Sequence, residues 1–113
     1  MNWIHLTRPE ELRAVNEASR QRPVLIFKHS TSCGISAMAL ARIERAWKPT
    51  DDHTTYFIDL RKNRDVSNAV EEQYGIRHES PQALIILAGQ CVHADSHSGI
   101  RYDALVAELE RAI

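Results

Sequence analysis

The sequence predicts an α/β protein with one central mixed sheet and helices on both faces of that sheet. Short apolar runs rich in β-branched and aromatic residues, such as Val24–Phe27 and Ala83–Leu87, alternate with segments of helical periodicity. Strands separated by helices are expected to pair in parallel through right-handed crossovers. The last two strands, joined by the tight turn Ala88–Gln90, are expected to form an antiparallel hairpin. The predicted order is therefore β-α-β-α-β-α-β-β-α.

Length and composition restrict the class of protein. The 113 residues fit one domain, 1–113, that can bury a core without metals or disulfides. With 43% hydrophobic residues, 26% charged residues and a formal net charge of -1, the chain gives no electrostatic argument for binding nucleic acid or an anionic membrane. No apolar run is long enough to span a bilayer, and the N-terminus lacks the pattern of a signal peptide. We therefore expect a cytoplasmic protein.

The first helix carries a start signal in its sequence. Trp3–Leu6 is expected to be an edge strand, and Thr7 is expected to be the N-cap of the helix that follows. Glu10 stands three residues further on, which is the spacing of a capping box, and Pro9 is tolerated in a first turn. We expect this helix over Arg8–Arg20, with its apolar side chains turned inward.

The later elements are delimited by turn residues and by changes of periodicity. Gly75 is placed to end the third helix as its C′ residue. The expected elements after the first helix are strand Val24–Lys28, a helix from Cys33 to about Trp47, strand Thr54–Leu60, helix Val66–Tyr74, strands Ala83–Leu87 and Cys91–His97, and helix Tyr102–Ala112.

Cys33 lies at the junction between a buried strand and a helix. Behind it Ile35, Met38, Ala39, Ile43 and Trp47 recur at helical spacing, so the helix begins at or just after the cysteine. The first N–H groups of a helix and its dipole favour an anion, and the anion of a cysteine is the nucleophilic thiolate. A lone cysteine is more often a buried apolar residue, but this one stands in the polar run S-T-S-C-G-I-S. We interpret Cys33 as a redox-active thiol.

The order of elements resembles that of the thioredoxin fold. In thioredoxin-like proteins the redox cysteine follows the strand of the first βαβ half, and a cis-proline precedes the hairpin beside the sulfur. Cys33 and Pro81 occupy these two places, and Tyr74–Arg77 followed by Ser80–Pro81 is similar to the segment that leads into that proline. The resemblance implies a thioredoxin-like fold for nearly the whole chain.

A closer resemblance is to the monothiol bacilliredoxin family. Phe27–Ser36 is similar to that family's F-K-H-S-T-x-C-x-I-S signature, and Trp3 and the run Arg77–Ile85 are similar too, whereas Gly34 stands where the family often has proline. The resemblance implies a thiol-disulfide oxidoreductase that removes bacillithiol from client proteins carrying it as a mixed disulfide. Bacillithiol is then a co-substrate, and no permanently bound cofactor is expected.

The resemblance also implies which residues surround the reaction. With no C-x-x-C motif, Cys33 would act alone and a free thiol would resolve its mixed disulfide. From position, Arg77 and Gln82 beside Pro81 are candidates to bind the acidic malate part of bacillithiol. The expected thiol pocket comprises Lys28, His29, Ser30, Thr31, Ser32, Gly34, Ser36, Ser80 and Pro81.

Two other functions remain open from the sequence. Cys33–Ser36 resembles the C-G-F-S motif of monothiol glutaredoxins, which bind glutathione and can share a 2Fe–2S cluster, and Lys28 fits that family. Against this, Gly89–His93 and Ser98–Ile100 lack the glycine pair and acid that clamp glutathione there. The third alternative is a thioredoxin-like binding domain in which the cysteine is inert.

The remaining cysteine and the histidines are expected to be structural. Cys91 follows the hairpin turn, which places it roughly 20 Å from Pro81, whereas a disulfide needs Cα atoms within about 7 Å. His93 and His97 are four residues apart, but not on a helix, so their spacing does not predict a zinc site.

Overall fold

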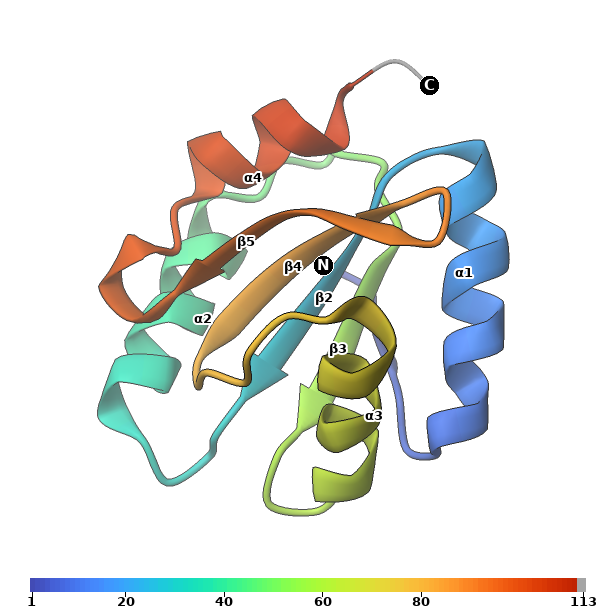
Figure 1. Cartoon of the computed structure of the whole chain (residues 1–113). Helices are drawn as coiled ribbons and strands as arrows, with labels where there is room; N and C mark the ends of the chain where they lie inside the picture. Colours follow the sequence, from blue (N-terminus) through green and yellow to red (C-terminus); the bar gives the residue numbers. More distant parts are fainter. Residues whose placement is uncertain (112–113) are drawn as a thin grey trace.

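The computed structural model describes residues 1–111, and its elements follow the order predicted from the sequence (Figure 1). The expected end of the last helix at Ala112 lies outside the described residues. The elements are β1 (Trp3–His5), the 3₁₀ helix η1 (Pro9–Glu11), α1 (Leu12–Gln21), β2 (Val24–His29), α2 (Gly34–Ala46), β3 (Thr55–Asp59), α3 (Arg64–Tyr74), β4 (Gln82–Leu87), β5 (Gln90–Ser96), the 3₁₀ helix η2 (His97–Gly99) and α4 (Tyr102–Leu109).

The strands form a mixed sheet in the order β1-β3-β2-β4-β5. β3 pairs in parallel with both β1 and β2, as expected for strands joined through helices. β4 also follows a helix, yet it runs antiparallel to β2, so the expectation of parallel pairing is wrong for this strand. The reason is the segment 75–81, which brings the chain back to the edge of the sheet where β2 ends, so that Gln82 pairs with Lys28.

Helices cover the two faces of the sheet in pairs, and each pair closes a separate apolar cluster (Figure 1). α1 and α3 cover the face on which Ile26 of β2 lies, and α2 and α4 cover the face of Phe27. Successive side chains of a strand point to opposite faces, so the continuous apolar run of β2 supplies both clusters. This central strand is buried along its whole length and carries the loop that leads to Cys33.

The start of the first helix differs from the expectation. Arg8 is the N-cap of η1, and Glu11, not Glu10, closes the capping box. Glu11 Oε1 accepts hydrogen bonds from the backbone N–H groups of Thr7 and Arg8 at 2.8 and 2.9 Å. Pro9 at the first helical position moves the start of the helix one residue along the chain, which makes Glu11 the N3 residue.

Two predicted stops are confirmed. Gly75 ends α3 in the left-handed conformation at φ +69°, and its N–H donates to Glu71 O at 2.9 Å. Ala88 and Gly89 both have positive φ in the turn between β4 and β5, which suits a tight antiparallel hairpin. Within residues 1–111, no helix has both the length and the apolarity needed to cross a membrane.

Candidate active site

Cys33 is the N-cap residue of α2, at the edge of the sheet where the parallel strands β2 and β3 end. Its backbone is extended, its carbonyl accepts the first helical hydrogen bond from Ala37 N at 3.1 Å, and its side chain is partly exposed. The N–H groups of the first helical turn have no partner within the helix. Cys33 therefore stands at the end of α2 that carries the positive end of the helix dipole.

A cis-proline stands at the same edge of the sheet. The Ser80–Pro81 peptide bond is cis, as the resemblance implied. Gln82 pairs with Lys28 in the β2–β4 register, so Pro81 lies beside the end of β2 from which the Cys33 loop departs. Pro81 is buried, and its carbonyl accepts a hydrogen bond from His97 N at 3.0 Å, which ties it to η2.

The loop before Cys33 is held by a buried serine of α2. Ser36 Oγ accepts a hydrogen bond from Ser30 N at 3.0 Å and lies 2.7 Å from Nδ1 of His29. Ser36 is fully buried and His29 is only 8% exposed. Burial lowers the pKa of His29 below its usual value, against the opposing charges of Asp59 and Glu44. This contact could not be predicted from the sequence, because its partners lie seven positions apart on different elements.

Lys28 lies on the opposite face of the sheet from His29, because neighbouring residues of a strand alternate between faces. Its side chain is fully buried under α3, where Nζ lies 3.3 Å from His78 Nδ1 and 3.5 Å from Ser67 O. Burial lowers the pKa of Lys28 to about 8, aided by Arg64 and opposed by Glu71. The structure therefore does not bring this amine to the α2 face of the sheet with His29.

The side chain of Gln82 is hydrogen-bonded to the backbone of Arg77. Gln82 is 2% exposed, and its Nε2 donates to Arg77 O at 3.0 Å, so this side chain holds the loop and has little surface to offer a ligand. The Arg77 side chain is exposed. Two buried atoms at this edge, Ser80 Oγ and Gln82 Oε1, have no hydrogen-bond partner among residues 1–111.

Two apolar side chains of α2 are exposed near Cys33. The helical spacing of Ile35 and Met38 with Ala39 and Ile43 correctly predicts a helix, but only the last two residues are buried. Ile35 is 54% exposed and Met38 is 66% exposed, whereas Ser36 takes an inward position in the first turn. Thr31, Ser32 and Gly34 are also exposed around the thiol.

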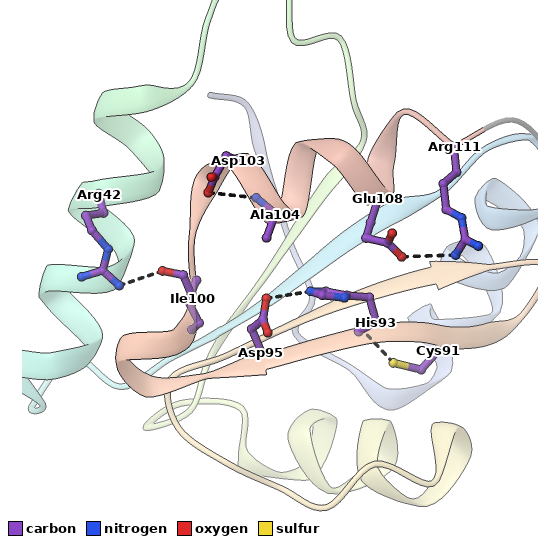
Figure 2. A network of polar contacts seen from close by, with 9 residues as sticks. All are labelled: Arg42, Cys91, His93, Asp95, Ile100, Asp103, Ala104, Glu108 and Arg111. Atoms are coloured by element: carbon purple, nitrogen blue, oxygen red, sulfur yellow. Dashed lines mark hydrogen bonds and ion pairs between the residues drawn. The ribbon is translucent and has the colours of Figure 1, made fainter.

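Cys91 lies far from this site and on the other face of the sheet from α2. It pairs with Ile86, five residues along β4 from Pro81, which is roughly 16 Å at about 3.3 Å per residue. It packs against the cluster under α1 and α3, and its Sγ donates to His93 O at 3.3 Å (Figure 2). Burial raises the pKa of the Cys91 thiol, which disfavours its thiolate.

The histidines of β5 and η2 are paired with carboxylates. His93 Nε2 lies 2.7 Å from Asp95 Oδ2 on the same strand (Figure 2), and His97 Nε2 lies 3.4 Å from Glu79.

Within the described chain, Asp51, His53 and Glu110 are the three potential metal ligands close enough to share an ion. Asp51 Oδ2 already accepts hydrogen bonds from Tyr102 and Lys48, and the Arg22 cation lies 3.3 Å from His53, so this group is occupied by protein contacts.

The mixed sheet, the thiol at the start of α2 and the cis-proline before β4 define a thioredoxin-fold protein. The chain is similar to a protein assigned as an oxidoreductase with a thioredoxin fold, with a TM-score of 0.78 and 28% identity over 95% of this chain and 93% of that one. It is also similar to a thioredoxin of Fasciola hepatica, with a TM-score of 0.71 and 15% identity over 93% of this chain and 94% of that one. A thioredoxin of Trypanosoma brucei brucei matches with a TM-score of 0.73 and 12% identity over 96% of this chain and 88% of that one.

These comparisons establish the fold, and a family comparison goes further. The family model described as monothiol bacilliredoxin BrxC matches residues 4–105, which is nearly the whole chain. The chain therefore belongs to the monothiol bacilliredoxin family. Membership implies a bacillithiol-related thiol–disulfide redox activity, in agreement with the resemblance found in the sequence.

Proposed function

We propose that this protein removes bacillithiol from client proteins that carry it as a mixed disulfide, with Cys33 as its sole nucleophile. The observation that supports this most is the position of Cys33 at the start of α2, at the same edge of the sheet as cis-Pro81 and with Cys91 far along β5. The residue one turn further on, where a dithiol protein would carry its resolving cysteine, is Ser36.

The reaction consists of two disulfide exchanges. The Cys33 thiolate attacks the bacillithiol-side sulfur of the mixed disulfide, so that a new S–S bond forms and the client's thiolate leaves and takes a proton from solvent. A second bacillithiol thiolate then attacks the bacillithiol sulfur bound to Cys33 and displaces the Cys33 thiolate. The net exchange converts the client's mixed disulfide and one free bacillithiol thiol into the client thiol and bacillithiol disulfide, so one S–S bond replaces another and no further oxidant or reductant is needed.

The surrounding residues have roles that follow from their positions. The start of α2 stabilises the thiolate, and the exposed pocket residues Thr31, Ser32 and Gly34 border it. The exposed Arg77 guanidinium is the candidate for the malate carboxylates of bacillithiol, with Gln82 holding its backbone. A reducing cytoplasm suits this activity, since both cysteines are free thiols.

The first experiment is intact-mass analysis of the protein after exposure to bacillithiol disulfide and, separately, to glutathione disulfide. We expect a single bacillithiol adduct on the wild type and on Cys91→Ser, none on Cys33→Ser, and much slower modification by glutathione disulfide. Faster reaction with glutathione disulfide, or a coloured dimer after iron–sulfur reconstitution, would favour the glutaredoxin activity. No adduct with either reagent would leave a binding domain.

A further inference from the structure

Ser36 connects His29 to the loop that carries Cys33. Its Oγ lies 2.7 Å from His29 Nδ1 and accepts the Ser30 N–H at 3.0 Å, while Cys33 N donates to Ser30 O at 3.2 Å. Ser36 is the third residue of α2, so its side chain lies one turn along the helix from Cys33 on the same side. The turn that presents the thiol is therefore fixed at its first residue by a buried hydroxyl.

The partners of Ser36 Oγ indicate which atom donates in this pair. Among the described residues these partners are the Ser30 N–H, which can only donate, and His29 Nδ1, so Nδ1 is the one acceptor within reach of the Ser36 O–H. Because a fully buried hydroxyl needs an acceptor, the Ser36 O–H is assigned as the donor to neutral His29, whose imidazole then carries its proton on Nε2. A protonated imidazole has two N–H donors and no acceptor, so the bond must then run from Nδ1 to Ser36 Oγ.

The surroundings of His29 favour its neutral form. The ring packs against the rings of Phe27 and Phe57, with centroids 6.3 and 5.5 Å away. The charged or titratable groups around it are Asp59 on β3, Glu44 on α2 and His5 on β1, whose ring packs on Phe57. Desolvation outweighs the attraction of the two carboxylates, which lowers the pKa of His29.

We propose that His29 and Ser36 form a positioning pair that holds the Cys33 loop ready for thiol–disulfide exchange while His29 is neutral and releases it when His29 is protonated. The reversal leaves the Ser36 O–H without its acceptor inside a buried site, and an unpaired buried donor is costly. Rotation of the hydroxyl toward another acceptor weakens the hydrogen bond that Ser36 Oγ accepts from Ser30 N. The inference uses the proposed function only in naming the reaction of Cys33.

The test measures how fast the Cys33 thiolate reacts with iodoacetamide from about pH 5 to pH 8, the range in which histidine titrates. Dividing each rate by the thiolate fraction, obtained from ultraviolet absorbance, removes the titration of Cys33 itself. A Cys91→Ser background leaves one thiol. The wild-type rate per thiolate is expected to fall on acidification by about threefold to tenfold, the value of one hydrogen bond.

Three variants separate the titration of His29 from the hydrogen bond of Ser36 and from unrelated effects of pH. His29→Asn keeps an acceptor oxygen on the atom that bears Nδ1 but does not titrate, so its rate per thiolate should stay near the wild-type neutral value at every pH. Ser36→Ala should react slowly at every pH, because it lacks the hydrogen bond that Ser36 Oγ accepts from Ser30 N. His5→Asn, the matched control, should keep the wild-type profile. Circular dichroism shows that each variant is folded, and His29→Asn tests the inference even where Ser36→Ala does not fold.

An acid fall of the same size in His29→Asn as in the wild type would overturn the inference, and so would a wild-type profile in Ser36→Ala. Repeating the series with bacillithiol disulfide separates this inference from the proposed function. If the wild type shows the alkylation profile but forms no bacillithiol adduct, the proposed function fails and the positioning pair stands. If adducts form but the alkylation rate per thiolate is flat in the wild type, the positioning pair fails alone.

Discussion

Lys28 Nζ lies 3.3 Å from His78 Nδ1 beneath the sheet, so a lysine amine is buried against an imidazole instead of a carboxylate. Glu71, whose charge acts on the amine, accepts a hydrogen bond from the backbone N–H of His78 at 3.0 Å through its carboxylate. His78 also contacts Ser67 Oγ at 3.2 Å. These contacts connect the end of β2 to α3 and to the loop before Pro81, and burial lowers the pKa of Lys28 to about 8.

Replacing Lys28 with methionine is expected to stabilise the protein at pH 7 by about 1–3 kcal/mol. The pKa falls from 10.5 to about 8 on folding, so between these values the unfolded chain binds a proton that the folded chain has lost, and stability rises with pH. Below pH 8 the folded protein bears the full cost of the buried charge, about 3 kcal/mol, part of which returns through the two hydrogen bonds.

Urea denaturation of the wild type and Lys28→Met at pH 7 and near pH 9.5 measures this effect, and the advantage of the variant should shrink at the higher pH. Lys62→Met, at an exposed lysine, is the control and should leave both values almost unchanged. A Lys28→Met variant that is less stable than the wild type at pH 7 would mean that the amine's hydrogen bonds outweigh its desolvation.

Features encoded by neighbouring residues could be predicted from the sequence, and contacts between distant elements could not. The apolar run of β2, the stop at Gly75 and the cysteine at a strand–helix junction are local patterns, and all three are found. Lys28 and His29 are adjacent basic residues in the sequence, and strand alternation places them on opposite faces of the sheet. Which of them faces α2 depends on how the sheet is covered.

The buried serine shows the same limit of local patterns. The spacing of Ile35 and Met38 indicates an apolar helix face, yet these residues are exposed and Ser36 is buried. A buried hydroxyl needs a partner, and the partners of Ser36 are His29 and the Ser30 backbone, both outside its helix. Helical periodicity is judged from apolar residues alone, so it cannot indicate that a serine has hydrogen-bond partners on another element.

Glu11 and Glu10 provide a matched pair for testing the start of the first helix. Glu11 Oε1 accepts hydrogen bonds from Thr7 N, Arg8 N and Thr7 Oγ1, whereas Glu10 is not part of the capping box. Glu11→Ala should lower the free energy of unfolding by about 1 kcal/mol, and Glu10→Ala by a few tenths at most. Equal effects in the two variants would contradict the capping arrangement.

The pH dependence of that cap has a defined sign. Hydrogen bonds from Thr7 and Arg8 lower the pKa of Glu11 below its usual 4.5, so the folded chain releases this proton more readily than the unfolded chain does. The stabilisation is complete above about pH 4.5 and is lost as the pH falls through the folded value. The stability difference between the wild type and Glu11→Ala should therefore shrink in urea titrations performed at acid pH.

Cys91 should be almost inert in the native protein. Its thiol is half-buried, donates to His93 O and has a raised pKa, so little thiolate forms at neutral pH. Brief treatment with iodoacetamide followed by peptide mass analysis should find modification at Cys33 only. Urea should make Cys91 reactive as well. A Cys33–Cys91 disulfide in the oxidised native protein would contradict the geometry described above.

Ser36→Cys should convert the protein from a monothiol to a dithiol exchanger. Residues three apart at the start of a helix have Cβ atoms about 5–6 Å apart, and a small adjustment reaches the roughly 4 Å that a disulfide requires. After attack on bacillithiol disulfide, Cys33 carries the adduct, and the new thiol can displace it to form an internal disulfide.

Intact mass should show the adduct accumulating on the wild type, and a loss of two hydrogens without an adduct on Ser36→Cys. Ala37→Cys adds a thiol at the next, exposed position of α2 and should keep the adduct far longer. A persistent adduct on Ser36→Cys would mean that the Ser36 position points away from Cys33 Sγ.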